Sequence, residues 1–153
     1  MDAHVHEGFY EAYASLREDL HRAVREEVRR NGVAEIYFTG HSLGGAMATL
    51  AAKDFHHNSL PRINAHLRQL HQQQAARSRQ AVPEEFNDVR IGIYNFGSPR
   101  VGDFAFHNLY NRALPNTFRV VVDGDLVTGV PKNSQGFRHA GTQILIDDKV
   151  SIG

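Results

Sequence analysis

The chain has 153 residues, with 17 basic and 17 acidic side chains and no cysteine. Because the charges balance, no net positive potential attracts nucleic acid or an anionic membrane. The lack of cysteine excludes a disulfide framework, a thiolate metal site and a cysteine nucleophile. No run of 18 apolar residues is present, and the first residues lack the basic and apolar regions of a signal peptide. Any lipid contact is therefore expected to be peripheral. The cellular location is left open, although the absence of cysteine favours the cytoplasm.

The first part of the chain, residues 7–30, has the pattern of one amphipathic helix. Its apolar stripe recurs at three- and four-residue steps and consists of Phe9, Tyr13, Leu16, Leu20, Val24 and Val28. The opposite face carries charges of both signs, which favours a solvated surface over a membrane-surface helix. Gly32 after Asn31 is a natural helix stop.

Short runs rich in β-branched and aromatic residues predict strands at 33–39, 89–95, 117–122 and 142–146. Helical patterns separate them, one following Ser42 and another beginning after Asp103, a plausible N-cap, and running through Tyr110. Strands that alternate with helices predict an α/β fold with a mostly parallel sheet and helices on both faces. Residues 56–87 are polar and repetitive, and predict a mostly helical surface insertion.

Ser42 is the centre of a Gly-x-Ser-x-Gly sequence that lies between a predicted strand and a predicted helix. This is the pattern of a nucleophile elbow, where glycines are expected because side chains two residues from the serine would clash. The start of the helix suits an oxyanion, and the backbone N–H of Leu43 is the first candidate donor. The elbow residues around the serine are Gly40, His41, Gly44 and Gly45.

Two other interpretations of Ser42 remain open at this point. The serine could simply occupy a glycine-rich turn whose glycines serve helix packing. A phosphate-binding loop also combines glycine with a helix start, but this loop lacks the lysine of a P-loop.

A serine hydrolase also needs a carboxylate and a histidine, which follow the serine in that order in this fold. Asp123 and Asp125 both come directly after the strand at 117–122. Asp123 precedes Gly124 and is the better turn residue, which leaves Asp125 as the better acid. His139 is the only histidine after Asp125, so chain order alone nominates it as the base.

Five segments together resemble the class 3 lipases, the fungal-lipase-like α/β-hydrolases. They are residues 5–9, 39–46, 94–102, 119–127 and 139–146. The resemblance implies an α/β-hydrolase core that hydrolyses carboxylic esters of lipids, chiefly acylglycerols or phospholipids, without a cofactor. It also implies that Ser42 is the nucleophile, Asp125 the triad acid and Leu43 a backbone donor of the oxyanion hole.

The chain departs from the family pattern in ways that affect the expected activity. His139 matches the family's His-x-Gly strand motif, so we expect it to be hydrogen-bonded at the start of a strand. The family's catalytic histidine lies beyond the strand matched by 141–147, so we expect the true base beyond Gly153. His41 is expected to be a packing residue.

The resemblance also places the family's second oxyanion donor and its lid before the segment at 5–9. We therefore expect one partial domain, incomplete at both ends, that is a weak or inactive hydrolase alone.

Closely spaced histidines occur at His4 and His6, at 56 and 57, and at 66 and 71, but no carboxylate or cysteine pattern accompanies them. No metal site is expected from them. Another class of function stays open, a non-catalytic lipase-like module that binds lipid or a protein partner. A serine peptidase or a thioesterase on the same fold is a further alternative.

Overall fold

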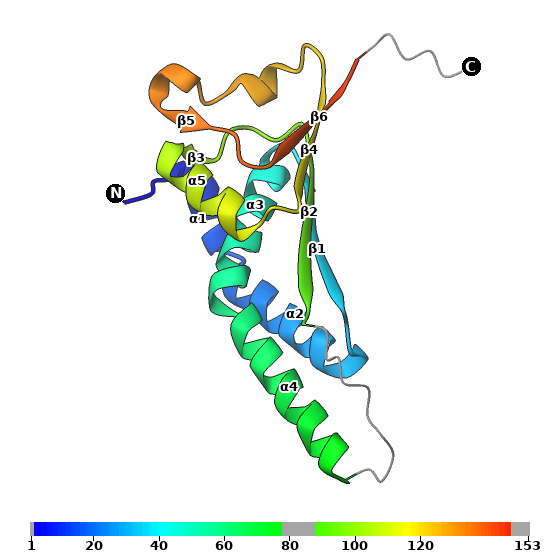
Figure 1. The fold of residues 1–153 in the computed structure, drawn as a ribbon. Helices are drawn as coiled ribbons and strands as arrows, with labels where there is room; N and C mark the ends of the chain where they lie inside the picture. The colour runs from blue at the N-terminus through cyan, green and yellow to red at the C-terminus, as the bar shows by residue number, and fades with distance from the viewer. Residues whose placement is uncertain (1, 78–87, 148–153) are drawn as a thin grey trace, which may run out of the picture.

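A four-stranded parallel sheet with strand order β1-β2-β4-β6 forms one side of the molecule (Figure 1). The computed structural model describes residues 2–77 and 88–147. The strands are β1 (Glu35–His41), β2 (Arg90–Phe96), β4 (Thr117–Val122) and β6 (Thr142–Ile146). The last two have the predicted bounds, and β2 is displaced by one residue. β1 begins two residues later than predicted and continues to His41, so it delivers the chain directly to Ser42.

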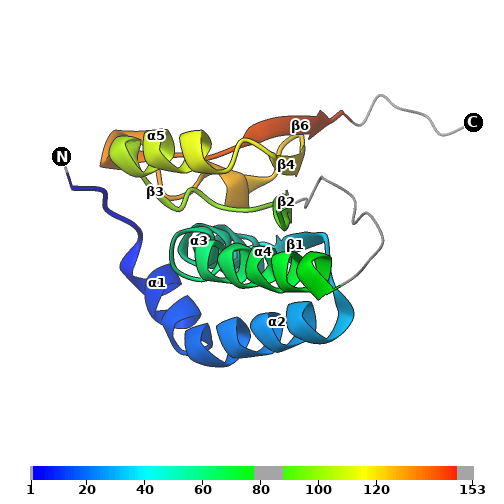
Figure 2. The same ribbon diagram turned by 60° about the horizontal axis from the view of Figure 1, so that its bottom comes forward.

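The helices are α1 (Glu7–Ala14), α2 (Arg17–Asn31), α3 (Leu43–Asn58), α4 (Leu60–Arg77) and α5 (Phe104–Ala113). α3 packs directly on β1 and β2, and α1 and α4 pack against α3. Figures 1 and 2 show the helices on the same side of the strands. Helices on both faces were expected, but within the described residues they cover one face only.

Two short antiparallel strands that the sequence pattern did not predict lie at the end of the sheet near α5. They are β3 (Gly102–Asp103) and β5 (Phe137–Arg138), and the short 3-10 helices η1 (Leu126–Gly129) and η2 (Asn133–Gln135) precede β5. The predicted cap of α5 is confirmed, because Asp103 Oδ1 accepts a hydrogen bond from the Phe106 N–H at 2.8 Å.

The prediction of one helix over residues 7–30 is wrong, because α1 ends at Ala14 and α2 begins at Arg17. The Ser15 hydroxyl donates to the Ala12 carbonyl oxygen at 2.8 Å, and the chain turns there before α2 starts. Leu16, which the periodic pattern assigned to the apolar stripe, is therefore 53% exposed at the break. Gly32 ends α2 in the left-handed conformation, as predicted.

The core lies between α3 and the sheet, and small residues of α3 bring the helix close to the strands. Ala46 and Ala52 are fully buried, and the ring of Phe55 packs 5.8 Å from that of Phe38 on β1. Burial of a side chain such as Phe55 contributes about 2 to 3 kcal/mol to folding. The core thus fixes the helix whose first residue follows Ser42.

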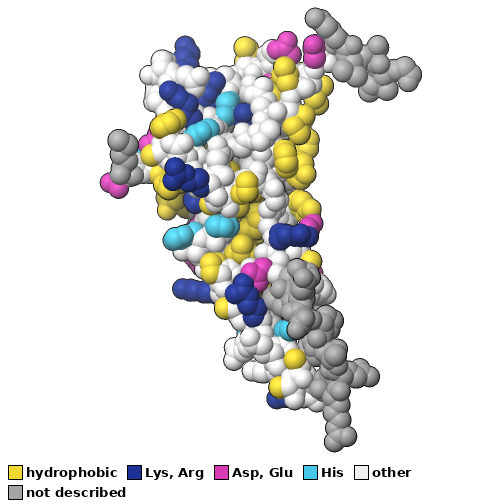
Figure 3. Space-filling model, viewed as in Figure 1, with side chains coloured by type: hydrophobic (Ala, Val, Ile, Leu, Met, Phe, Trp, Pro, Cys, Tyr) yellow, Lys and Arg dark blue, Asp and Glu magenta, His cyan; other side chains and the backbone are white. Residues whose placement is uncertain are grey.

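The opposite face of the sheet is rich in exposed apolar side chains. Tyr37, Tyr94, Phe96 and Ile144 are each at least 41% exposed, and strand register places Phe96, Val120 and Ile144 in one row. Hydrophobic side chains line this side of the molecule at the right of Figure 3. Parallel sheets are usually covered on both faces, so this surface is an unusual one for a parallel sheet.

α4 forms a continuous helix within the segment at 56–87 that was expected to be mostly helical, and its Ile63 side chain is buried. The remainder of that segment, 78–87, lies outside the described residues. Among the helices of residues 2–77 and 88–147, none combines the length and the hydrophobicity of a membrane span.

Candidate active site

Ser42 occupies a strained turn between β1 and α3. Its φ of 53° makes it the one non-glycine residue with positive φ in the described parts of the chain. Such a conformation costs about 1 to 3 kcal/mol and persists only where its surroundings enforce it. Here the Ser42 N–H donates to the Phe96 carbonyl oxygen at 3.0 Å, while the Ser42 carbonyl oxygen accepts from the Gly45 N–H at 3.0 Å. The Ser42 side chain is half-buried, and its hydroxyl makes no hydrogen bond within the described residues.

The glycines around Ser42 have different structural roles. A Cβ on Gly40 would lie 2.2 Å from the Gly44 carbonyl oxygen, and one on Gly45 would lie 2.8 Å from Ser98 Cβ. Both glycines are therefore required for the close approach of α3 to the strand ends. The expectation that Gly44 avoids a clash is wrong, because a Cβ there would meet nothing within 4 Å.

The first backbone N–H groups of α3 surround the serine. Leu43 is the first residue of this helix, so its N–H is one of those that an α-helix leaves without an internal partner. The N-terminal end of a helix also carries partial positive charge. The turn therefore presents a nucleophilic oxygen next to groups that can stabilise an oxyanion.

Asp125 lies after β4, two strands away from Ser42 at the same end of the sheet. Its Oδ1 atom accepts from the Val127 N–H at 2.9 Å, and its Oδ2 atom lies 2.9 Å from the point where a Cβ on Gly97 would be. Gly97, at the end of β2, has a φ of 57°. Because glycine has no side chain, Gly97 leaves room for the Asp125 carboxylate at the end of β2, the strand that lies between β1 and β4.

Asp123 forms a turn with Gly124, as its sequence predicted. The Asp125 N–H donates to the Val122 carbonyl oxygen at 3.2 Å, and Gly124 has a φ of 81°. The Asp123 side chain is exposed. The geometry therefore separates the two aspartates, with Asp125 directed to the strand ends and Asp123 in the turn.

Arg100 connects the loop after β2 to the loop that contains η1. Its Nη1 atom donates to the Gly129 and Pro131 carbonyl oxygens at 2.5 and 2.9 Å, and its backbone N–H donates to the Val130 carbonyl oxygen at 2.9 Å. These bonds hold the chain that follows Asp125.

His139 is hydrogen-bonded just before β6, as expected from its match to the strand motif. Its Nε2–H donates to the Thr128 carbonyl oxygen at 2.9 Å, while its Nδ1 atom is buried without a partner. Burial first, and then the charge of Arg119, lower the pKa of His139 to about 4. Within the described residues it makes no hydrogen bond to Ser42 or Asp125. The nomination of His139 as the base by chain order alone therefore has no support in the geometry.

The other expectation for the base placed it beyond Gly153. Gly153 lies outside the described residues, which end at Asp147. The structure therefore does not test this expectation, and a base beyond Gly153 stays a prediction.

His41 is exposed, so the expectation that it is a packing residue is wrong. Every second side chain of β1 faces the uncovered side of the sheet, and that of His41 is one of them. His41 pairs in register with Phe96, which is also exposed. Its Nε2 atom lies 3.6 Å from the position that a Cβ on Gly97 would take, and Asp125 Oδ2 lies 2.9 Å from the same position.

Exposed apolar side chains surround this end of the sheet. Leu43, Phe96 and Val127 are 46%, 44% and 40% exposed, and Leu126 is 86% exposed. The sequence motifs contain the polar residues of the site, and this apolar rim was not predicted from them. The signal was present in the Leu126-Val127 pair, which follows the candidate acid directly.

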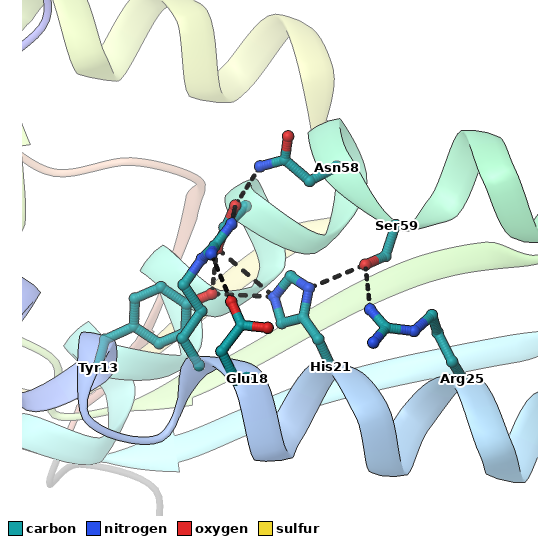
Figure 4. Close-up of polar contacts among 8 residues, drawn as sticks. Tyr13, Glu18, His21, Arg25, Asn58 and Ser59 are labelled. Atoms are coloured by element: carbon teal, nitrogen blue, oxygen red, sulfur yellow. Dashed lines mark hydrogen bonds and ion pairs between the residues drawn. The ribbon is translucent and has the colours of Figure 1, made fainter.

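A second group of serine, histidine and aspartate side chains lies at the far end of α3 (Figure 4). Ser59 Oγ lies 2.8 Å from His21 Nδ1, and His21 Nε2 lies 3.0 Å from the Tyr13 hydroxyl, which donates to Asp54 at 2.5 Å. Ser59 is 3% exposed, and its oxygen also accepts from Arg25 at 3.3 Å. The Ser59 oxygen is thus held by both His21 and Arg25, and the group joins α1, α2 and α3.

No three histidine, cysteine, aspartate or glutamate side chains gather as a possible metal site within residues 2–77 and 88–147.

Comparison with known proteins decides the family. The model of the family described as "Lipase (class 3)" matches residues 1–135. The chain belongs to the class 3 lipase family. The lipase of Rhizomucor miehei is 31% identical over 145 residues, which are 94% of this chain and 33% of the relative. The secreted mono- and diacylglycerol lipase 1 of Fusarium solani is 28% identical over 143 residues, 94% of this chain and 34% of the relative.

Solved lipase structures share the fold. The crystal structure of the lipase from Rhizopus microsporus var. chinensis matches with a TM-score of 0.72 and 28% identity, over 94% of this chain and 42% of that one. A triacylglycerol lipase with a serine protease triad as its catalytic centre matches with a TM-score of 0.69 and 28% identity, over 95% and 46% of the two chains. The α/β-hydrolase fold class is thereby confirmed. The chain spans about a third of the length of the curated relatives it matches.

Proposed function

We propose that the protein hydrolyses carboxylic ester bonds of lipids, with Ser42 as the nucleophile. The observation that carries the proposal is the left-handed Ser42 at the start of α3, held by the close approach of Gly40 to Gly44. Relatives named lipases support the reaction class. The exposed apolar rim formed by Leu43, Phe96, Leu126 and Val127 supports a lipid substrate and contact with a lipid surface.

In the proposed reaction, Ser42 Oγ attacks the carbonyl carbon of the ester while a base takes the hydroxyl proton. The Leu43 N–H donates to the oxyanion of the tetrahedral intermediate. The bond from the carbonyl carbon to the alcohol oxygen then breaks, and the alcohol leaves with that proton. Water attacks the acyl-enzyme in the same way and releases the fatty acid, which restores the serine hydroxyl.

Asp125 would serve as the acid that orients the catalytic base. Its position beside Gly97 and the hydrogen bond that it accepts from the Val127 N–H support a fixed carboxylate. His139 is not proposed as the base, because its Nε2 proton is bonded to Thr128 and its pKa is lowered to about 4. The proposal keeps the base that the family resemblance implies, a histidine beyond Gly153. No metal or cofactor enters the proposal.

The test is the rate of dioctanoylglycerol hydrolysis by the full native protein and three variants. Ser42→Ala should lose at least about 10⁴-fold in kcat/KM, and Asp125→Asn about 10³-fold or more. Asp123→Asn is the matched control and should change the rate less than about twofold, because Asp123 lies in the turn. Equal losses from the two aspartate variants would contradict the assignment of Asp125. Unchanged activity of Ser42→Ala would contradict the proposed function itself.

The alternative of a non-catalytic module is not favoured by the relatives, which are named as lipases.

A further inference from the structure

A basic cleft of about 510 Å³ lies between α2 and α4. One wall consists of Arg22, Arg25 and Arg29, whose spacing places them on one face of α2. The other wall includes Arg62 and His66, which lie one turn apart on α4. A second cleft of about 530 Å³ continues from it, and Arg25 and Arg62 line both.

The positive charge where the two clefts meet is not neutralised within the described residues. Arg25 and Arg62, which line both clefts, have no carboxylate of the described residues within 4.0 Å, and neither does Arg29, which lines the first cleft. Glu26 lines the first cleft and lies 3.9 Å from Arg30. Glu18 lines the second cleft and lies 2.8 Å from Arg17, so each of these carboxylates already has a partner. Like charges that converge without a counter-charge repel one another, so a bound anion would stabilise this arrangement.

The second cleft offers buried polar groups beside these arginines. His21 and Ser59 line it and are 4% and 3% exposed. Arg25 donates to Ser59 Oγ at 3.3 Å, and Figure 4 shows its guanidinium directed toward that serine. This bond fixes the guanidinium at the junction, where its other N–H groups can donate to an anion.

The floor of the first cleft is apolar. Val28 and Ile63 are 1% and 6% exposed at its base, and the half-buried Leu67 extends it along α4. An apolar floor that leads from a cationic junction matches a ligand with a charged head and a hydrocarbon chain. An inorganic anion would use only the junction.

We propose that this cleft binds a long-chain fatty acid as its carboxylate, with the head group at Arg25 and Arg62 and the chain along Val28, Ile63 and Leu67. The site is distinct from Ser42. Ser59, at the junction, follows the 16-residue helix α3, whose length of about 24 Å separates it from the serine at the start of that helix.

The test is isothermal titration of laurate into the full protein, with two comparison ligands. Laurate should bind to the cleft at least tenfold more tightly than inorganic phosphate, which lacks the chain, or dodecyl maltoside, which lacks the charge. Equal affinity for dodecyl maltoside would overturn the role of the arginines, and equal affinity for phosphate would overturn the role of the apolar floor.

Arg62→Gln is the diagnostic variant, because Arg62 is exposed and makes no ion pair within the described residues. It should weaken laurate binding at least tenfold. Arg112→Gln, an equal change of charge on α5, should leave binding unchanged. If Arg62→Gln does not fold, Arg29→Gln is the second variant, and it should also weaken laurate binding. Laurate binding that is the same in both cleft variants and the wild type would overturn the proposal.

The NMR methyl signals of Ile63 and Ile144 separate this cleft from the exposed sheet face. Laurate should shift the Ile63 signal and leave that of Ile144 in place, and the reverse result would overturn the proposal. Laurate contains no ester bond, so hydrolysis at Ser42 does not enter the measurement. Failure of this inference is therefore distinguishable from failure of the proposed function.

Discussion

Gly40 and Gly44 face each other across the turn that holds Ser42, so closely that a Cβ on Gly40 would lie 2.2 Å from the Gly44 carbonyl oxygen. The reverse does not hold, since a Cβ on Gly44 would meet no atom within 4 Å. The two glycines of one motif therefore differ in what they contribute to the fold.

Gly40→Ala should destabilise the protein by about 3 kcal/mol, because backbone atoms must move to admit the methyl group. Gly44→Ala lies in a helix and should be neutral or stabilising by up to about 1 kcal/mol. Urea unfolding of the two variants measures the difference. Similar losses of stability in both would contradict the geometry of the turn.

Asp54 should make stability depend on pH under acidic conditions. Burial would raise the pKa of Asp54, but hydrogen bonds from Arg17, Tyr13 and Asn58 outweigh it and lower the pKa from 3.8 to about 2. The stabilisation, roughly 2 kcal/mol, is fully present above pH 3.8 and is lost as pH falls toward 2. Asp54→Asn should lose about that amount at pH 7 and approach the wild type near pH 2.

Urea unfolding between pH 7 and pH 2 tests this expectation. Asp19→Asn is the control, because the side chain of Asp19 is 79% exposed in its pair with Arg22. Its effect should stay below about 0.5 kcal/mol. A wild type and an Asp54→Asn variant with parallel pH profiles would show that Asp54 is not the titrating group.

His139 should affect stability in a separate pH range. Its pKa falls from 6.5 to about 4 on folding, mainly through burial, so the unfolded chain binds the proton more readily between these values. Stability should therefore decrease by up to about 3 kcal/mol as pH falls from 6.5 to 4. His139→Gln should flatten this decline, whereas His57→Gln, a change at an exposed histidine, should not. Unfolding midpoints across this range provide the measurement, and an unaltered slope in His139→Gln would refute the assignment.

The exposed sheet face should cause residues 1–153 expressed alone to self-associate. Ile144 and Leu109 are 43% and 49% exposed, the first on the sheet and the second on α5. Ile144→Lys should shift the chain toward monomer in sedimentation velocity, and Leu109→Lys should not, because the association buries the apolar face. A wild-type chain that is monomeric at about 100 µM would contradict this expectation.

The sequence predicted the strands better than the helices. The runs at 117–122 and 142–146 had clear β-branched patterns, and the structure has strands with these bounds. The break after Ala14 could not be predicted from periodicity, because Leu16 continues the apolar pattern although it is exposed. At the break the Leu16 N–H donates to the Tyr13 carbonyl oxygen, three residues back, in place of the helical bond four residues back.

The candidate site was predictable where a short motif contains all of its members. Gly40, Ser42 and Gly45 lie within one short stretch of sequence, so their turn could be inferred from it. The contact of Asp125 with Gly97 joins two strand ends, and the pairing of His21 with Ser59 joins two helices. Both depend on tertiary packing, which periodicity does not encode.

The most direct test of the account is covalent labelling of the full native protein with a fluorophosphonate, followed by peptide mass spectrometry. One adduct is predicted, on Ser42, and it should be absent from Ser42→Ala while Ser59 stays unlabelled in both. An enzyme that hydrolyses lipid esters yet is labelled elsewhere, or is not labelled at Ser42, would contradict the assignment of Ser42 as the nucleophile.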